Sequence, residues 1–159
     1  MNDQDQHTPV ITCDLSYTLV DESERSIADG SAKAMLDDRF LSINPDTGEQ
    51  LNISYAEVVG IVEEDYRIKL SLSSGYKISL SQLGYDYENF LINLYKLRNE
   101  LFIRYLLMNE RLRVLQIDSS FVYYMKGEEV LRGLSELRLY DSALLILPQK
   151  KKQIGRAHV

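Results

Sequence analysis

Few residues of this chain have the types and spacing that chemistry requires. The sequence contains a single cysteine, Cys13, and two histidines, His7 and His158. A zinc site needs several Cys or His ligands, and Ser-His-Asp or Cys-His catalysis needs a histidine beside the nucleophile. Cys13 lies in the strand-like stretch "VITCDLSYTL", where we expect a buried small hydrophobic residue; a reactive thiol is the alternative. We therefore expect no catalytic residue, no metal site and no enzymatic activity.

Carboxylates occur in two short clusters, Asp37-Asp38 and the Glu-Glu-Asp run at 63–65. Adjacent residues on one turn rarely converge on a cation or a proton, so we interpret both clusters as solvated turns. The glycines are dispersed, and neither phosphate-binding pattern, GxGxxG or GxxxxGK[ST], is present. The sequence predicts no bound cofactor.

The best candidate for a ligand surface is cationic. In "YRIKLSLSSGYKISLSQL", Arg67, Lys69 and Lys77 alternate with apolar residues, which places them on the outer face of an expected hairpin turning at Gly75. Such a face could hold a phosphate or an anionic lipid head group. The alternative is a solvated strand face, balanced by the acidic run at 63–65.

Charge and hydropathy narrow the classes of partner. The chain carries a formal charge of -6, with -12 on residues 1–65 and +6 on residues 66–159. The excess of acidic residues over residues 1–110 opposes nucleic-acid binding. No stretch is long and apolar enough to span a membrane, and the polar N-terminus does not look like a secretory signal. We expect a cytoplasmic protein that binds neither nucleic acid nor membranes.

A change of period marks the one expected helix. In "LGYDYENFLINLYKLRNELFIRYLLMNE", apolar residues recur at three- and four-residue steps, which predicts a helix over about 86–110. Its second half is apolar around much of its circumference, so another surface should cover it. The candidate interface residues are Phe102, Ile103, Leu106 and Leu107.

Before this helix the sequence alternates between short strand-like runs and turns. This order resembles the pleckstrin-homology-like small barrels, including their GRAM-type relatives. The resemblance covers roughly residues 10–110 and implies an α+β fold, a small antiparallel barrel of six to seven strands capped by a C-terminal helix. Some pleckstrin-homology domains bind phosphoinositides through basic early loops, but here the early loops "DESERSIADG" and "DDR" are mainly acidic.

Strand-like runs return after the helix, and part of this region repeats the first. Residues 30–45 align without a gap with residues 133–148, with six identities in 16 positions. The upstream runs "LSYTLV" and "SSFVYY" also align, with Leu19 on Val122. An offset of 103 residues exceeds the period of about 20–50 residues found in solenoids, so it favours a duplicated domain. Two hairpins that became similar by convergence are the alternative.

These patterns give the expected domain organisation. Residues 1–9 form a tail, 10–110 the barrel with its helix, and 112–153 the first strands of a second, truncated barrel. The ending "IGRAHV" at 154–159 resembles one reading frame of a common sequencing adapter, ATC GGA AGA GCA CAC GTC, and we expect it to be non-native. On that interpretation His158 has no functional weight.

Three functions are compatible with the sequence. The first is a non-enzymatic protein-interaction or scaffolding module of tandem pleckstrin-homology-like barrels, whose partner is another protein or the second domain of the same chain. The second is weak binding of an anion or lipid head group on the hairpin. The third is a regulatory domain fused to an enzyme encoded downstream.

Overall fold

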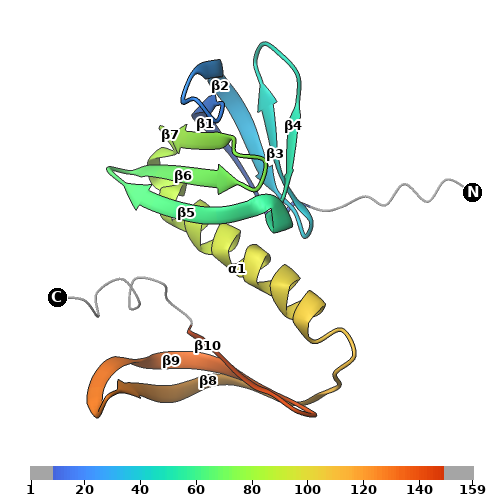
Figure 1. Ribbon diagram of the computed structural model, residues 1–159, viewed down its shortest axis with the longest axis vertical. Helices are drawn as coiled ribbons and strands as arrows, with labels where there is room; N and C mark the ends of the chain where they lie inside the picture. The colour runs from blue at the N-terminus through green and yellow to red at the C-terminus, as the bar shows by residue number, and fades with distance from the viewer. Residues whose placement is uncertain (1–8, 149–159) are drawn as a thin grey trace, which may run out of the picture. The chain divides into compact units, whose positions relative to one another are not determined.

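The computed structural model of the chain describes residues 9–148, which divide into one unit ending at Arg104 and another beginning at Tyr105 (Figure 1). Most of the expected N-terminal tail, the lysines at 150–152 and the adapter-like ending lie outside the described residues.

The first unit contains seven strands and a helix whose last two residues lie beyond Arg104. Its elements are β1 (Ile11–Val20), β2 (Ser26–Leu36), β3 (Phe40–Pro45), β4 (Leu51–Ser54), the 3-10 turn η1 (Tyr55–Glu57), β5 (Val58–Glu64), β6 (Arg67–Leu72), β7 (Lys77–Ser81), the 3-10 turn η2 (Gly84–Asp86) and α1 (Tyr87–Leu106). The strands form one curled antiparallel sheet in the order β4-β3-β2-β1-β7-β6-β5. This α+β small barrel confirms the expected fold class.

Strand β1 lies at the centre of this sheet. It pairs with β2 along its length and with β7 over Ser16–Val20. Because alternate side chains of a strand face opposite sides, Cys13, Leu15 and Tyr17 all point to the interior, where they are buried. The other strands add inward-facing aliphatic residues, and together they form one continuous core.

Helix α1 completes that core. Phe90, Leu91 and Leu94 are buried in it, and Leu97 and Leu101 pack against it while partly exposed. The helix is shorter than the expected 86–110. It ends at Leu106, and the Glu110 amide then donates to the Leu107 carbonyl at 2.9 Å, closing a turn where a longer helix would have continued.

The hairpin of β6 and β7 confirms the alternation in the sequence. Ile68 and Leu70 pair with Leu80 and Ile78 on the buried side. Gly75 in its turn has a φ of 91°, a backbone conformation that residues with a side chain rarely adopt.

The second unit is a three-stranded antiparallel sheet of the order β10-β9-β8. It contains β8 (Leu112–Met125), β9 (Glu128–Tyr140) and β10 (Leu144–Pro148). A two-residue turn joins β8 to β9 at Lys126 and Gly127, both with positive φ, as in the type I′ turns that suit tight hairpins. Its only buried residues in the described part are two serines, Ser119 and Ser135.

The two units share a strand-pairing pattern. Leu36 pairs with Leu41 and Ala34 with Ile43 in the first, whereas Leu139 pairs with Leu144 and Leu137 with Ile146 in the second. All five pairs of β9 with β10 correspond to pairs of β2 with β3 at the offset of 103 residues seen in the sequence. The two turns match as well, because the Asp37 amide donates to the Phe40 carbonyl as Tyr140 does to Ala143.

The correspondence continues into the preceding strands. Gly30 lies opposite Tyr17, and Gly133 opposite Phe121. A bulge follows at the same point in both ladders, between Leu19 and Val20 in β1 and between Tyr123 and Tyr124 in β8.

One irregularity in β8 changes the upstream alignment. Between Gln116 and Ser119 this strand has one residue more than the corresponding part of β1. Leu19 therefore corresponds to Tyr123, and not to Val122 as the ungapped alignment predicted. A bulge inserts a residue without ending the strand, so the hydrophobic pattern did not indicate it.

Candidate functional site

The candidate anion-binding residues lie on β6 and β7, and carboxylates lie close to them. The Lys69 Nζ is 2.9 Å from Glu64 Oε2, and the Lys77 Nζ is 3.2 Å from Glu24 Oε1. Arg67 is exposed and is the cross-strand partner of Glu64 in the ladder of β5 and β6. The structure thus places the three cations on neighbouring strands, with Arg67 beside the turn between β5 and β6 and Lys77 beside the turn at the opposite end of β6, and each end also carries acidic residues.

Electrostatics follow from this arrangement. The hydrogen bond from Lys69, the charge of Lys69 and the charge of Arg67 together lower the pKa of the Glu64 carboxyl. Glu64 therefore stays ionised near neutral pH, and its single negative charge offsets part of the charge of Lys69 and Arg67. An incoming anion would have to displace carboxylates that already neutralise much of this face.

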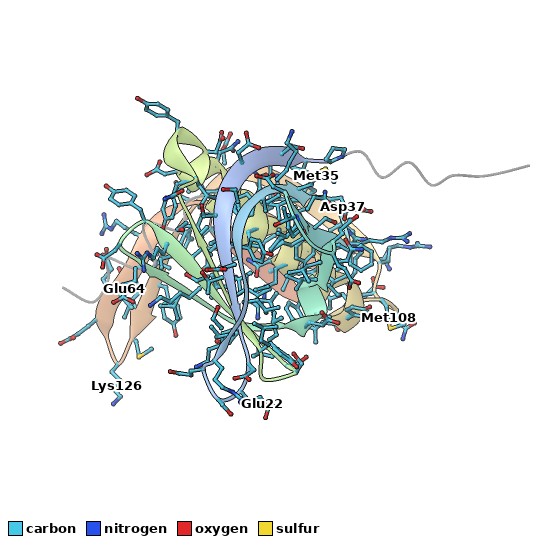
Figure 2. The ribbon with its side chains drawn as sticks, turned by 90° about the horizontal axis from the view of Figure 1, so that it is seen from above. Glu22, Met35, Asp37, Glu64, Met108 and Lys126 are labelled. Carbon is cyan, nitrogen blue, oxygen red and sulfur yellow. The ribbon has the colours of Figure 1, made fainter. Side chains whose placement is uncertain are left out.

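The loop between β1 and β2 adds further negative charge here. Besides Glu24 it carries Glu22, whose side chain lies so close to Gly75 that a Cβ there would come within 2.5 Å of it. Both Glu22 and Glu64 are exposed (Figure 2). The Asp21 carboxylate is bound within the loop by the Arg25 side chain at 3.2 Å and by the Ser23 and Arg25 amides.

The four candidate interface residues differ in their surroundings. Phe102 is partly buried, with the Arg98 guanidinium 4.8 Å from the centre of its ring, and the Arg98 Nε donates to the Val58 carbonyl at 3.0 Å. Ile103 and Leu107 are partly buried, whereas Leu106 is 80% exposed. Since α1 ends at Leu106, the residues do not form one continuous helical stripe.

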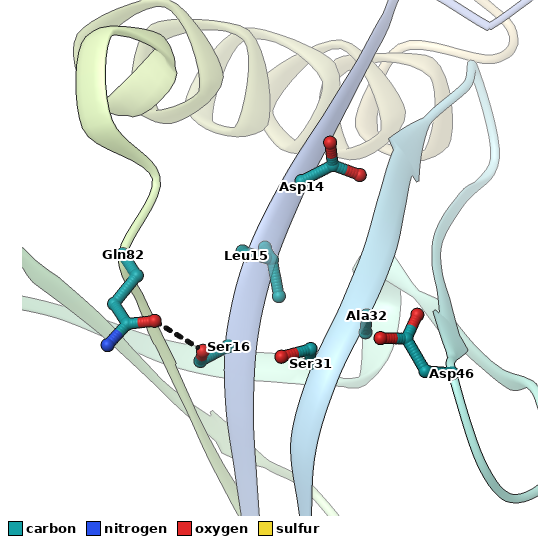
Figure 3. A pocket seen from close by; sticks show the side chains of 7 residues that line it. All are labelled: Asp14, Leu15, Ser16, Ser31, Ala32, Asp46 and Gln82. Atoms are coloured by element: carbon teal, nitrogen blue, oxygen red, sulfur yellow. Dashed lines mark hydrogen bonds between the residues drawn. The ribbon is translucent and has the colours of Figure 1, made fainter.

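One shallow pocket lies over β1 and β2. It has a volume of about 230 Å³ and is lined by Asp14, Leu15, Ser16, Ser31, Ala32, Asp46 and Gln82 (Figure 3). The Ser16 hydroxyl donates to the Gln82 side-chain carbonyl at 2.8 Å, so two of its polar groups satisfy each other. Small-molecule sites usually occupy about 300–1,000 Å³ and are mostly apolar, so this pocket does not resemble one.

A buried tyrosine holds the turn between β2 and β3. The Tyr55 hydroxyl donates to the Asp37 carbonyl at 2.6 Å and lies 3.0 Å from the Phe40 carbonyl. Burial and the nearby charges of Asp37 and Asp38 raise the pKa of this hydroxyl far above its usual range. Asp37 also accepts the amides of Arg39 and Phe40, so it has a structural role in the turn.

Cys13 is buried in the barrel. Burial, with smaller contributions from Asp86 and Asp14, raises the pKa of its thiol to about 11. A thiol in this state is almost entirely protonated at neutral pH, and the thiolate is the reactive form.

Residues 9–148 show neither a metal-binding cluster nor a membrane-spanning helix. No group of three or more His, Cys, Asp or Glu side chains is arranged to hold a metal ion. No helix in this range has the length and apolar character needed to cross a membrane.

Sequence reasoning missed the Tyr55 anchor and the pocket. Tyr55 reaches residues 15 and 18 positions earlier in the chain, and the pocket combines β1, β2 and residues after β3 and β7. The ion pair of Lys77 with Glu24 joins residues 53 positions apart. The surplus of acidic residues in the loop at 21–25 was the only signal for it.

Comparison with known proteins gives similarity in structure but not in sequence. No protein-family model matches the chain, and no curated protein matches it. A structure described as showing a critical structural role for the PH and C1 domains of the Vav1 exchange factor has 13% identity and a TM-score of 0.50. That match covers 98% of this chain, which spans 44% of the Vav1 chain.

Two further structures are similar. Vav1 bound to an allosteric inhibitor has 13% identity and a TM-score of 0.49 over 98% of this chain and 44% of its own. The C-terminal domain of an unknown protein from Leishmania infantum also has 13% identity and a TM-score of 0.49, over 61% of this chain and 89% of its own. Similarity at this identity concerns the fold alone. With the curled seven-stranded sheet and its C-terminal helix, the match at 0.50 supports a pleckstrin-homology-like fold.

Proposed function

We propose that the chain is a non-catalytic protein-interaction or scaffolding module of tandem pleckstrin-homology-like barrels, acting in the cytoplasm. The observation that carries the proposal is the curled seven-stranded sheet closed by α1, similar in fold to a structure that contains a pleckstrin-homology domain. Domains of this fold generally mediate contacts with proteins or lipids. Fold alone does not determine function, so the choice between the two rests on the surface.

The surface favours a protein partner. Lys69 and Lys77 are each paired with a carboxylate, and the β1–β2 loop beside Lys77 is acidic. An anionic membrane would be repelled by this loop. In contrast, Leu106 at the end of α1 is largely exposed, and an exposed aliphatic residue beside other apolar side chains favours contact with protein.

The tandem arrangement is supported by the matching strand pairs. From Ile11 to Pro45, and again from Val114 to Pro148, three strands pair in the same order with a glycine opposite an aromatic residue and a bulge at the same point. A single one-residue insertion separates the two patterns. Two hairpins similar by convergence would not be expected to share the bulge and the third strand.

A capture experiment with matched variants tests the proposal. The chain, a Leu106→Glu variant and a Tyr85→Glu variant would be used as bait in an extract of the source cells, with captured proteins quantified by mass spectrometry. Tyr85 is fully exposed on η2 and serves as the control. We expect a defined protein to be retained by the chain and by Tyr85→Glu, and to fall about tenfold with Leu106→Glu. Equal retention by both variants would contradict this use of the helix end.

Vesicle co-sedimentation distinguishes the lipid alternative. The chain would be mixed with neutral vesicles and with vesicles containing phosphatidylserine and phosphoinositide. We expect no enrichment on the anionic vesicles. Strong sedimentation that is abolished by reversing the charges of Arg67, Lys69 and Lys77 would replace the proposed protein partner with a lipid head group.

A further inference from the structure

In the described part of the chain β8 is an edge strand, whereas the equivalent strand of the first unit, β1, is paired on both sides. In the first unit β1 pairs with β2 on one side and with β7 on the other, where Ser16–Val20 face Ser81–Lys77. In the second unit β8 pairs with β9 and forms the edge of its sheet in the described part of the chain. The shared register makes Ser120–Tyr124 the equivalent of Ser16–Val20.

We propose that β8 binds an antiparallel β-strand along Ser120–Tyr124, in the place that β7 takes on β1. The occupant is a strand of the second barrel of this same protein, with the alternating apolar and small polar residues of β7. This inference rests on the proposed tandem function and deepens it by locating the contact.

Exposure of equivalent residues supports the inference. Leu36, Leu41 and Ile43 are fully buried in the first unit. Their equivalents Leu139, Leu144 and Ile146 are 43%, 58% and 47% exposed. The same face of the same hairpin is thus covered in one unit and open in the other. In the first unit the cover comes from the remaining strands and α1, and β7 is the part of that cover that pairs directly with β1.

The chemistry of the edge fits strand addition. Residues 119–125, "SSFVYYM", contain no charge and are rich in aromatic and β-branched residues, which favour strands. Natural proteins usually protect a long free edge with lysine, proline or a bulge, because its unpaired backbone groups recruit other strands. The bulge near Asp118 precedes this segment, and Lys126 follows it in the turn. The seven residues between them, 119–125, contain neither lysine nor proline. The bulge between Tyr123 and Tyr124 has its counterpart between Leu19 and Val20 of β1, which pairs with β7 there. Ser120–Tyr124 therefore remain suited to pairing.

The register also specifies the partner residues. Tyr17 pairs with Leu80 and Leu19 with Ile78 in the first unit, and their equivalents in β8 are Phe121 and Tyr123. The incoming strand should place aliphatic side chains beside these two aromatic rings. Between them, opposite Val122, it should place a small polar residue such as Ser79 of β7.

A synthetic peptide provides the test. The peptide of residues 76–82, "YKISLSQ", reproduces β7 and would be titrated into the intact 159-residue chain by fluorescence anisotropy. A control peptide carries Ile78→Ser and Leu80→Ser and keeps its charge. Hydrogen exchange would be measured in parallel. We expect binding of the first peptide only, with exchange slowed about tenfold or more at those amides of Ser120–Tyr124 that point away from β9.

Two variants of β8 locate the contact. Tyr123→Lys places a charge within the proposed contact, and Val114→Lys places one at the equivalent of Ile11, a residue of β1 that does not pair with β7. Tyr123 and Val114 are 50% and 52% exposed, so both substitutions should be tolerated. We expect Tyr123→Lys to weaken binding about tenfold or more and Val114→Lys to change it less than about twofold. Unchanged exchange of β9 and β10 amides verifies that each variant keeps its sheet.

The results of these experiments distinguish a strand of the second barrel from other partners of the β8 edge. Failure of the β7 peptide to bind, or binding that both variants weaken equally, overturns the inference. Association of the chain with itself, detected by light scattering and protecting Ser120–Tyr124 without peptide, would assign the edge to a second copy and also overturn it. Either result leaves the test at Leu106 unaffected, so failure of the β8 contact is distinguishable from failure of the proposed function.

Discussion

The two sheets of this protein share a strand-pairing pattern but differ in how far their apolar faces are buried. Around β1, β2 and β3, four further strands and α1 bury the inner face, and all the buried hydrophobic residues of the described chain lie between Cys13 and Leu94. Around β8, β9 and β10, the equivalent face holds aliphatic residues that remain about half exposed. Backbone pairing is therefore nearly the same in both units, and what differs is burial.

This difference separates two contributions to stability. Each hydrogen bond of a ladder contributes about 0.5–1.5 kcal/mol net, since the unfolded chain exchanges it for a bond to water. Burial of a large aliphatic side chain contributes about 1.5–3 kcal/mol. A three-stranded sheet whose apolar face is exposed therefore has its backbone hydrogen bonds but lacks most of the stabilisation that burial of that face would provide. One face of this sheet carries the aliphatic residues that are buried in the first unit, and we therefore expect further polypeptide to cover that face.

The largest effect should come from truncating one leucine in each unit. Leu41 is fully buried on β3, and its equivalent Leu144 on β10 is largely exposed. We expect Leu41→Ala to lower the free energy of unfolding by about 2–5 kcal/mol, from lost burial and a cavity. Leu144→Ala should cost less than about 1 kcal/mol. Urea denaturation followed by hydrogen exchange in each unit measures both, and equal losses would mean that the two faces are equally covered.

The second effect concerns thiols at equivalent positions. Cys13 pairs with Ala34, and the matching pair in the second unit is Gln116 with Leu137. Gln116 is exposed, whereas the pKa of the Cys13 thiol is raised from 9.0 to about 11. At a pH below both values, a thiol with a pKa of about 11 has about 100-fold less thiolate than one with a pKa of 9.0. At pH 8 we expect Cys13 to react with a disulfide reagent at least about 100-fold more slowly than a thiol introduced by Gln116→Cys in a Cys13→Ala background.

The direction of the pH dependence follows from the same shift. A thiol whose pKa is raised on folding favours the folded state fully below its unfolded pKa. The contribution is lost as the pH rises from about 9 through about 11. The native chain should therefore lose stability over that window relative to Cys13→Ala. Rapid labelling of Cys13 at pH 8 under native conditions would contradict its burial in the barrel.

The same comparison shows how far sequence reasoning extended. Alternation predicted the hairpin of β6 and β7 with Gly75 in its turn, and the gapless alignment predicted the matching pairs of β2 with β3 and of β9 with β10. The first feature depends on local period and the second on comparing two segments of the sequence, so neither requires knowing which elements meet in space. The extra residue before Ser119 changed the register of β8 without a hydrophobic signal. The ion pairs of Lys69 and Lys77 depend on which loops meet, and periodicity does not determine that.

The smallest expected changes in the free energy of unfolding concern the hydrogen bonds that hold the two equivalent turns. The turn between β2 and β3 is held by the buried hydroxyl of Tyr55, which donates to the Asp37 carbonyl. The turn between β9 and β10 is held at the surface, where Glu110 accepts the Ser142 amide at 2.9 Å and the Ser142 hydroxyl at 2.5 Å. We expect Tyr55→Phe to lower the free energy of unfolding by about 1–2 kcal/mol, because a buried carbonyl loses its donor.

Glu110→Gln should change the free energy of unfolding by less than about 0.5 kcal/mol, because the amide oxygen can still accept one of the two exposed Ser142 donors and water can accept from the other. Tyr85→Phe, at a fully exposed hydroxyl, controls for loss of a tyrosine hydroxyl as such. Thermal and urea denaturation of the three variants would measure the differences. If Glu110→Gln cost as much as Tyr55→Phe, the second turn would be as well shielded from water as the first, and the contrast in cover between the two sheets would not extend to their turns.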